Sequence, residues 1–132
     1  MARQSDLPRN YLTVAEVYQM QHLLIDHFGG GLHGIRDKNA IEAAVFRPQN
    51  GYYESLEEEA AALMESLANN NGFIDGNKRT AFAATDVFLR LNGFYIDVTA
   101  VEGHDFVDGS MERQEFRFRL ILDWIREHRK PL

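Results

Sequence analysis

The amino-acid sequence predicts an all-α protein, a compact bundle of about six helices with little or no sheet. Apolar residues recur at helical spacing through most of the chain, and only residues 94–96 are expected to be extended. Capping residues begin the helical segments, and Gly, Asn or Pro end them. The 132 residues contain no internal repeat, low-complexity tract or linker. We therefore expect one domain over residues 1–132.

The first half of the chain is expected to hold three helices. Thr13-Val14-Ala15-Glu16 is a capping box that begins a helix to about Phe28, and Gly29-Gly30-Gly31 ends it. Residues 32–36 are too short and too Gly-flanked for a helix, and predict a loop or a small flap. Asp37 caps a short helix that runs to about residue 46. A second capping box, at residues 55–58, begins a helix whose many small apolar residues permit close packing, which predicts a central position.

The second half is expected to hold three more helices. The first of these begins at Asp75 or Gly76 and ends at Asn92-Gly93. A short helix covers residues 99–107 and is broken by Asp108-Gly109. The last helix is expected to run from residue 113 to about residue 129. Four of its residues are expected to face inward: Phe116, Leu120, Ile121 and Trp124.

Composition excludes several classes of protein. The chain has no cysteine, which excludes disulfides and cysteine-based metal sites or nucleophiles. It has no run of 18 apolar residues that could span a membrane, and residues 1–6 lack an apolar signal segment, so a cytoplasmic location is expected. The net charge of −6 argues against broad nucleic-acid binding, although it is compatible with one local phosphate site.

The charge is unevenly distributed. Acids cluster in the middle of the chain at Glu54, Glu57, Glu58 and Glu59. Cations gather near the C-terminus at Arg113, Arg117, Arg119, Arg126, Arg129 and Lys130. Two solvated helix faces are the favoured interpretation, and the docking of a partner is the alternative.

Residues 69–80, Asn-Asn-Asn-Gly-Phe-Ile-Asp-Gly-Asn-Lys-Arg-Thr, are the most informative stretch. They join the end of one helix to the start of the next, where unpaired N–H groups and the helix dipole favour an anion. Lys78 and Arg79 oppose that dipole, which suggests that a negative group such as phosphate binds there. Gly76 allows close approach to the backbone. The pattern is not a P-loop, because it lacks Gly-x-x-x-x-Gly-Lys-Ser/Thr.

Two further residues of this stretch have interpretations of their own. Phe73 is an isolated aromatic in a polar loop and is expected to anchor the loop in the core. Asp75 is either the cap of the following helix or a ligand of Mg²⁺, which takes one or two carboxylates together with substrate phosphates. One residue can serve both purposes, with one oxygen on the helix and the other on the metal.

Residues 71–80 resemble the signature loop of the Fic/Doc family, His-x-Phe-x-Asp/Glu-Gly/Ala-Asn-Gly/Lys-Arg. The variant of the motif with lysine, here Lys78, resembles the Doc branch of the family, which comprises the toxins of Phd–Doc toxin–antitoxin modules. The likeness extends to Tyr11-Leu12-Thr13, to residues 28–32 and to residues 88–93, and so covers nearly the whole chain. The family's all-α bundle agrees with the fold predicted from the residues themselves.

The resemblance implies a site for ATP and Mg²⁺. Asp75 would hold Mg²⁺ on the nucleotide phosphates. Gly76, Asn77 and the following backbone N–H groups would form an anion hole, and Lys78 and Arg79 would neutralise phosphate charge. The nucleotide-binding residues would then be Phe73, Gly76, Asn77, Lys78 and Arg79.

The resemblance also implies an activity and partners. Doc-like members with Lys at this position are similar to protein kinases: they transfer the γ-phosphate to a threonine of a translation elongation factor and block translation. A cognate antitoxin neutralises them by laying a helical segment into a groove. Exposed apolar residues of the first helix and residues 46–53 are the surfaces considered for that groove. Operator DNA would be contacted by the antitoxin, and not by this chain.

Asn71 departs from the family pattern, which has a catalytic histidine there as general base. An amide cannot accept the proton of the target hydroxyl, and general-base catalysis typically contributes about 10²–10⁴-fold. Transfer should therefore be nearly silent while nucleotide binding persists. None of the five histidines, His22, His27, His33, His104 and His128, lies in the motif. His33 is the loop histidine considered as a substitute.

Two explanations of Asn71 stand at this point. An engineered inactivating substitution is favoured, because the rest of the motif is intact; a natural pseudo-enzyme is the alternative.

The function also has alternatives. A protein AMP-transferase is disfavoured by Lys78, where such members have Gly. A non-catalytic antitoxin-binding co-repressor would need the groove and no chemistry.

Overall fold

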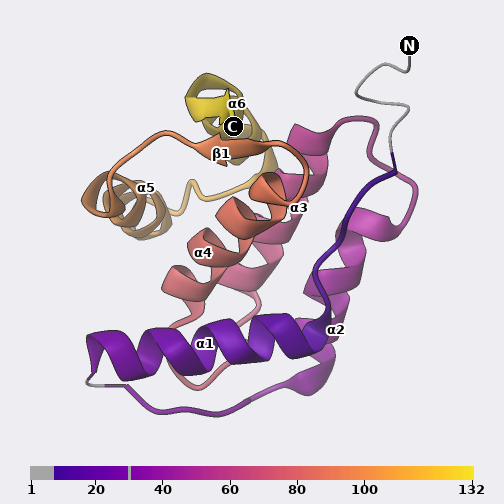
Figure 1. Ribbon diagram of the computed structural model, residues 1–132. Coiled ribbons are helices and arrows are strands. Elements are labelled where there is room, and N and C mark those ends of the chain that lie inside the picture. The colour runs from indigo at the N-terminus through magenta and orange to yellow at the C-terminus, as the bar shows by residue number, and fades with distance from the viewer. Residues whose placement is uncertain (1–7, 30) are drawn as a thin grey trace.

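The computed structural model describes residues 8–29 and 31–132, and within them it contains six α-helices (Figure 1). The predictions made on residues 1–6 and on Gly30 lie outside the described residues. The elements in chain order are α1 (Val14–Phe28), α2 (Lys38–Phe46), the 3₁₀ turn η2 (Arg47–Gln49), α3 (Leu56–Asn69), α4 (Asn77–Arg90), β1 (Phe94–Ile96), α5 (Ala100–Glu112), α6 (Phe118–His128) and β2 (Arg129–Pro131). The all-α prediction is confirmed. No helix among the described residues is both long enough and apolar enough to cross a membrane.

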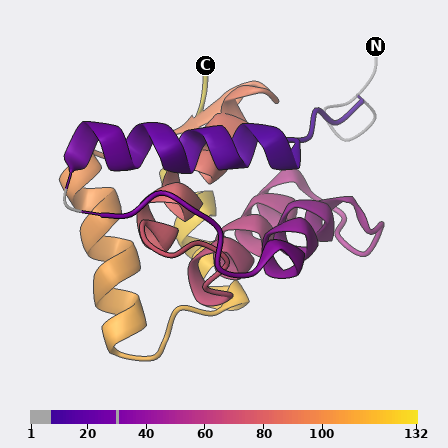
Figure 2. The same cartoon turned by 90° about the horizontal axis from the view of Figure 1, so that it is seen from below.

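Helices α3 and α4 lie side by side at the centre of the bundle (Figure 1). Helix α6 packs on α3, whereas α1 and α5 pack on α4. The second view shows α1 crossing one side of the bundle (Figure 2). Helix α3 is rich in small residues, and Ala60, Ala61 and Ala62 are fully buried although successive residues of a helix point in different directions. Ala81 and Ala84 of α4 are fully buried as well. These short side chains let the two backbones approach closely, which confirms the central position predicted for residues 55–69.

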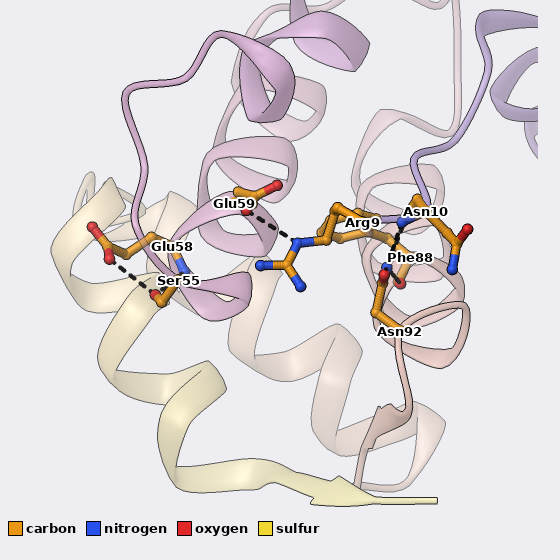
Figure 3. Close-up of polar contacts among 7 residues, drawn as sticks. All are labelled: Arg9, Asn10, Ser55, Glu58, Glu59, Phe88 and Asn92. Atoms are coloured by element: carbon orange, nitrogen blue, oxygen red, sulfur yellow. Dashed lines mark hydrogen bonds and ion pairs between the residues drawn. The ribbon is translucent and has the colours of Figure 1, made fainter. Parts of the chain in front are cut away.

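The segment before α1 contacts the end of this central pair at which α3 begins and α4 ends (Figure 3). The Arg9 guanidinium lies 3.1 Å from the carboxylate of Glu59 in the first turn of α3. Asn92 follows α4; its amide group accepts from the backbone N–H of Asn10 at 2.9 Å and donates to the carbonyls of Asn10 and Phe88. These contacts fix where α1 begins.

The two predicted capping boxes form to different degrees. The Thr13 hydroxyl accepts from the backbone N–H of Glu16, whose carboxylate accepts from the backbone N–H of Thr13, so this box is complete. The Ser55 hydroxyl accepts from the backbone N–H of Glu58, but the Glu58 carboxylate accepts from that hydroxyl and not from the backbone (Figure 3). Both residues still begin their helices where the sequence predicts.

The predicted bounds of the last two helices are wrong. Helix α5 continues through Asp108-Gly109 to Glu112, because Val107 and Ser110 are buried on either side of the expected break. Packing thus outweighs the intrinsic cost of glycine, about 1 kcal/mol. The chain turns instead at Gln114, whose φ is 59°. Helix α6 consequently begins at Phe118, and Leu120 is 37% exposed rather than inward-facing.

A two-stranded antiparallel sheet closes the C-terminal side of the bundle. Strand β1 pairs with β2 so that Tyr95 lies opposite Lys130. The sequence predicts the extended piece at residues 94–96 but not its partner, because residues 129–131 carry no strand pattern of their own. β2 also brings Arg129 to 2.5 Å from Glu57, an ion pair without hydrogen-bond alignment. Part of the acidic cluster is therefore paired within the chain: Glu57 with Arg129, and Glu59 with Arg9.

Candidate functional site

The loop between α3 and α4 carries the motif, and its shape is set by two of its own residues. The Phe73 ring is 2% exposed and meets the Tyr18 ring edge to face, which confirms its predicted role as an anchor. The Asn77 side chain accepts from the Phe73 N–H at 2.9 Å and donates to the Phe73 carbonyl at 3.0 Å. The side-chain amide of Asn77 thus closes the loop, and the backbone N–H of Asn77, at the start of α4, takes no part in these two hydrogen bonds.

Residues 31–36, here called the flap, pair with this loop. The Ile74 N–H donates to the Gly34 carbonyl at 3.1 Å, and the Arg36 and Asp37 N–H groups both donate to the Gly72 carbonyl. Ile35 and Phe73 form an isolated antiparallel bridge. The prediction of a loop or small flap is therefore confirmed, and the flap lies directly against the motif.

Asp75 does not cap α4. The N-cap is Gly76, whose φ of 78° lies in the left-handed region, and no side chain caps the helix. Instead, the Oδ2 atom of Asp75 accepts from the Leu32 N–H of the flap at 2.8 Å. Gln21 of α1 donates to the Asp75 and Leu32 carbonyls from the other side. Within residues 8–29 and 31–132, no hydrogen bond involves Oδ1 of Asp75, which leaves that oxygen for a ligand.

A cleft of about 380 Å³ opens over the start of α4. The structure brings most of the predicted site residues to it, and α5 forms its other wall. The lining residues are Ala68, Asn71, Ile74, Asp75, Gly76, Asn77, Lys78, Arg79, His104, Asp108 and Met111. The backbone N–H groups of Asn77, Lys78 and Arg79, the first three of α4, have no partner among the described residues, whereas that of Thr80 donates to the Gly76 carbonyl. The cleft therefore joins a carboxylate, two cations and open N–H donors.

The two cations of the motif have different surroundings. The Lys78 ammonium lies 2.5 Å from the Asp108 carboxylate of α5. This hydrogen bond and charge lower the pKa of Asp108 below its usual value. Arg79 is exposed, and its guanidinium lies over the Phe28 ring, 4.2 Å from the ring centre. Arg79 thus keeps its charge available, whereas Lys78 is held by a carboxylate.

The structure does not bring His33 into the cleft lining. The His33 ring stacks on His22 and forms an ion pair with Asp26, both of which belong to α1. His104 lines the cleft instead, together with Asp108. Sequence reasoning assigned neither to the site: it placed His104 in a helix of unknown position, and it placed Asp108 in the break that follows. In the continuous α5 they stand four residues apart on one face, which is the signal that the assumed break concealed.

A second, apolar cleft of about 350 Å³ adjoins the first. It lies between the end of α1, α4 and the start of α5, and it shares Lys78, Arg79 and His104 with the first cleft. Its other lining residues are apolar: Leu24, Phe28, Phe82, Ala83, Ala100, Val101 and Val107. Phe28 and Val101 are 52% and 68% exposed, so the apolar surface is open to a partner.

Comparison with known proteins identifies the family of this chain. The model of the family described as Fic/DOC matches residues 11–89, which include α1 to α3, all of α4 except its last residue, and the whole motif. The chain belongs to the Fic/DOC family. It is also similar to a protein named Toxin Doc from Mycolicibacterium smegmatis, with 49% identity over 71 residues. That match covers 50% of this chain and 54% of the relative, so it spans about half the length of either. Helix α5, which supplies His104 and Asp108, lies outside the residues that the Fic/DOC model matches.

Proposed function

We propose that this protein is a Doc-like toxin of a toxin–antitoxin module. Its cleft binds ATP with Mg²⁺, and the reaction is transfer of the γ-phosphate to a threonine of a translation elongation factor. The observation that carries the proposal is the convergence of Asp75, Lys78, Arg79 and the open N–H groups of α4 on one cleft. Such a set recognises a polyphosphate with a hard cation.

The donors of the cleft fit both groups. The Oδ1 atom of Asp75 is available as a hard oxygen ligand while Oδ2 stays on the flap. Gly76 allows phosphate to approach the backbone, and Arg79 offers a planar fork for two phosphate oxygens. When bound, Mg²⁺ would neutralise charge on the phosphates. The chain's own residues orient the nucleotide and stabilise the charge that develops during transfer.

Asn71 limits the chemistry. It is exposed at the edge of the cleft, and its φ is 51°. Asn and His are both enriched in this left-handed region, so a histidine here requires no change of backbone. The amide of Asn71 cannot remove the proton from a hydroxyl at accessible pH, so we expect nucleotide binding with very slow transfer.

The test is Asn71→His, incubated with ATP, Mg²⁺ and elongation factor. We expect transfer to rise by about 10²–10⁴-fold, and mass spectrometry to find a phosphate on a threonine of the factor. The control is Asn71→His combined with Asp75→Ala, which should abolish the gain. A mass increase that corresponds to one AMP would show that the protein transfers AMP and would refute kinase activity. No modification of any candidate protein would refute a transferase, and would favour a co-repressor that acts only through its antitoxin.

The apolar cleft is the proposed groove for a helical segment of the antitoxin. A helix there would lie against Lys78 and Arg79, and so would block the phosphate site as well as bind. The exposed apolar residues Phe46 and Tyr52 form the other surface considered, and they lie near η2, away from these cations.

Two charge substitutions distinguish the surfaces. Val101→Glu should weaken binding of the cognate antitoxin at least tenfold, because it buries a carboxylate in an apolar groove. Tyr52→Glu should leave binding unchanged. Isothermal titration of each variant gives the affinities. The opposite pattern would place the antitoxin on η2 and contradict the proposed groove.

A further inference from the structure

Three side chains outside the cleft converge on one point between α1 and the flap. His22 and Asp26 stand one turn apart on α1, and His33 comes from the flap. The two imidazole rings are stacked, with centres 3.8 Å apart and planes inclined by 17°. Nε2 of each ring lies near the same carboxylate, in ion pairs without hydrogen-bond alignment: His33 Nε2 lies 2.7 Å from Asp26 Oδ1, and His22 Nε2 lies 3.6 Å from Asp26 Oδ2.

An ion pair between His33 and Asp26 explains only part of this arrangement. It accounts for the His33–Asp26 contact, but it does not account for the second imidazole beside the same carboxylate. Because an imidazole nitrogen binds a metal in the plane of its own ring, the two stacked rings must separate when both bind one ion. The ligand atoms of all three residues lie within 4.8 Å of one another. Donors of one tetrahedral zinc ion, at about 2.0–2.1 Å from it, are about 3.3 Å apart. The separations of 2.7 and 3.6 Å involve the two different oxygens of Asp26, so these exposed side chains must turn slightly to bring three donors onto one ion.

We propose that His22, Asp26 and His33 bind a divalent transition metal ion, with Zn²⁺ as the best match. Two imidazole nitrogens and one carboxylate oxygen favour zinc and its neighbours over Mg²⁺, which prefers oxygen ligands alone. The three side chains are between 41% and 58% exposed, so an ion can enter without unfolding, and water completes its coordination. Each imidazole binds through Nε2 and keeps its proton on Nδ1.

The metal would act as a clamp on the flap. His33 is the neighbour of Leu32, whose N–H donates to Asp75 Oδ2 in the cleft. Gln21, the neighbour of His22, donates to the carbonyls of Leu32 and Asp75. An ion that joins His33 to α1 therefore holds the flap against the carboxylate of the phosphate site. This site is separate from the Mg²⁺ proposed at Asp75, and its existence does not depend on the proposed function.

The test is a zinc titration of the untagged full chain in a large excess of Mg²⁺, followed by competition with a chromophoric chelator. We expect one Zn²⁺ per chain. His22→Ala and His33→Ala should each lower the affinity at least about tenfold. His27→Ala is the matched control, because His27 is exposed on the same helix but outside the cluster. Asp75→Asn should also leave zinc affinity unchanged, because the amide oxygen can still accept from Leu32.

A second measurement tests the clamp. Zn²⁺ should slow amide hydrogen exchange in residues 31–36, while exchange in α6 stays the same, and His33→Ala should abolish the difference. Circular dichroism of the variants checks that each is folded. Absence of zinc binding, or binding unaffected by His33→Ala, would overturn the metal site. Zinc binding with unchanged exchange in the flap would overturn its action as a clamp.

Discussion

The interpretation of Lys78 changes once its contacts in the structure are known. In the sequence it is a cation placed against a helix dipole, which indicates a phosphate ligand. In the structure its ammonium already contacts the carboxylate of Asp108, a residue 30 positions further along the chain. Asp108 thus takes the place that a phosphate oxygen would occupy. A nucleotide must displace this carboxylate or share the ammonium with it.

Asp108→Asn should therefore tighten nucleotide binding. The amide removes the competing charge, and because exposed ion pairs are weak, the expected gain is roughly two- to fivefold. Titration with ATP and Mg²⁺ measures it. Asp105→Asn is the matched control, since Asp105 is exposed on the same helix and does not line the cleft. Weaker binding by Asp108→Asn would mean that the carboxylate itself contacts the nucleotide or its metal.

At the scale of elements, α6 depends on a cap from another helix. Its N-cap, Arg117, makes no side-chain cap. The Oε2 atom of Glu65, in the middle of α3, instead accepts from the Phe118 N–H at 2.7 Å. The other oxygen of Glu65 pairs with Arg47, whose guanidinium also bonds to the hydroxyls of Tyr53 and Ser66. One carboxylate thus joins α3, η2 and α6, a connection that no local sequence pattern reveals.

Glu65→Gln should lower the free energy of unfolding by about 1–3 kcal/mol, because a charge-assisted bond to a partly buried guanidinium becomes a neutral one. Glu65→Ala should cost more, since Arg47 then keeps a partly buried charge without its partner. Urea denaturation provides both values. The control is Glu127→Gln, at an exposed position of α6, and its free energy of unfolding should stay within about 0.5 kcal/mol of that of the original protein. Equal effects at both positions would contradict the proposed cap.

At the scale of the whole molecule, the segment before α1 is held by a buried charged group. Glu59 is 5% exposed and pairs with Arg9. Tyr11 lies beside them and stacks on Phe88 of α4. Burial, and then the neighbouring Glu59 carboxylate, raise the pKa of Tyr11 to about 12. The fold therefore favours the neutral phenol over the phenolate.

This shift predicts alkaline sensitivity. The unfolded Tyr11 has a pKa of about 10, so its contribution to stability is complete below pH 10 and is lost as the pH rises through about 12. The unfolding free energy of the original protein should fall relative to Tyr11→Phe over that interval. Denaturant titrations at successive pH values measure the difference. A difference that does not vary with pH would show that Tyr11 does not couple folding to this titration.

The sequence by itself determined the helical class, the starts of α1, α2 and α3, the buried anchor Phe73 and the family motif. These depend on local patterns: capping residues, helical periodicity and a contiguous loop. Only the tertiary structure decided that α5 continues past Gly109, that Asp75 bonds to the flap, and that His104 and Asp108 complete the cleft in place of His33. The physical reason is that burial of residues such as Val107 and Ser110, and partners distant in the chain, outweigh local preferences of about 1 kcal/mol.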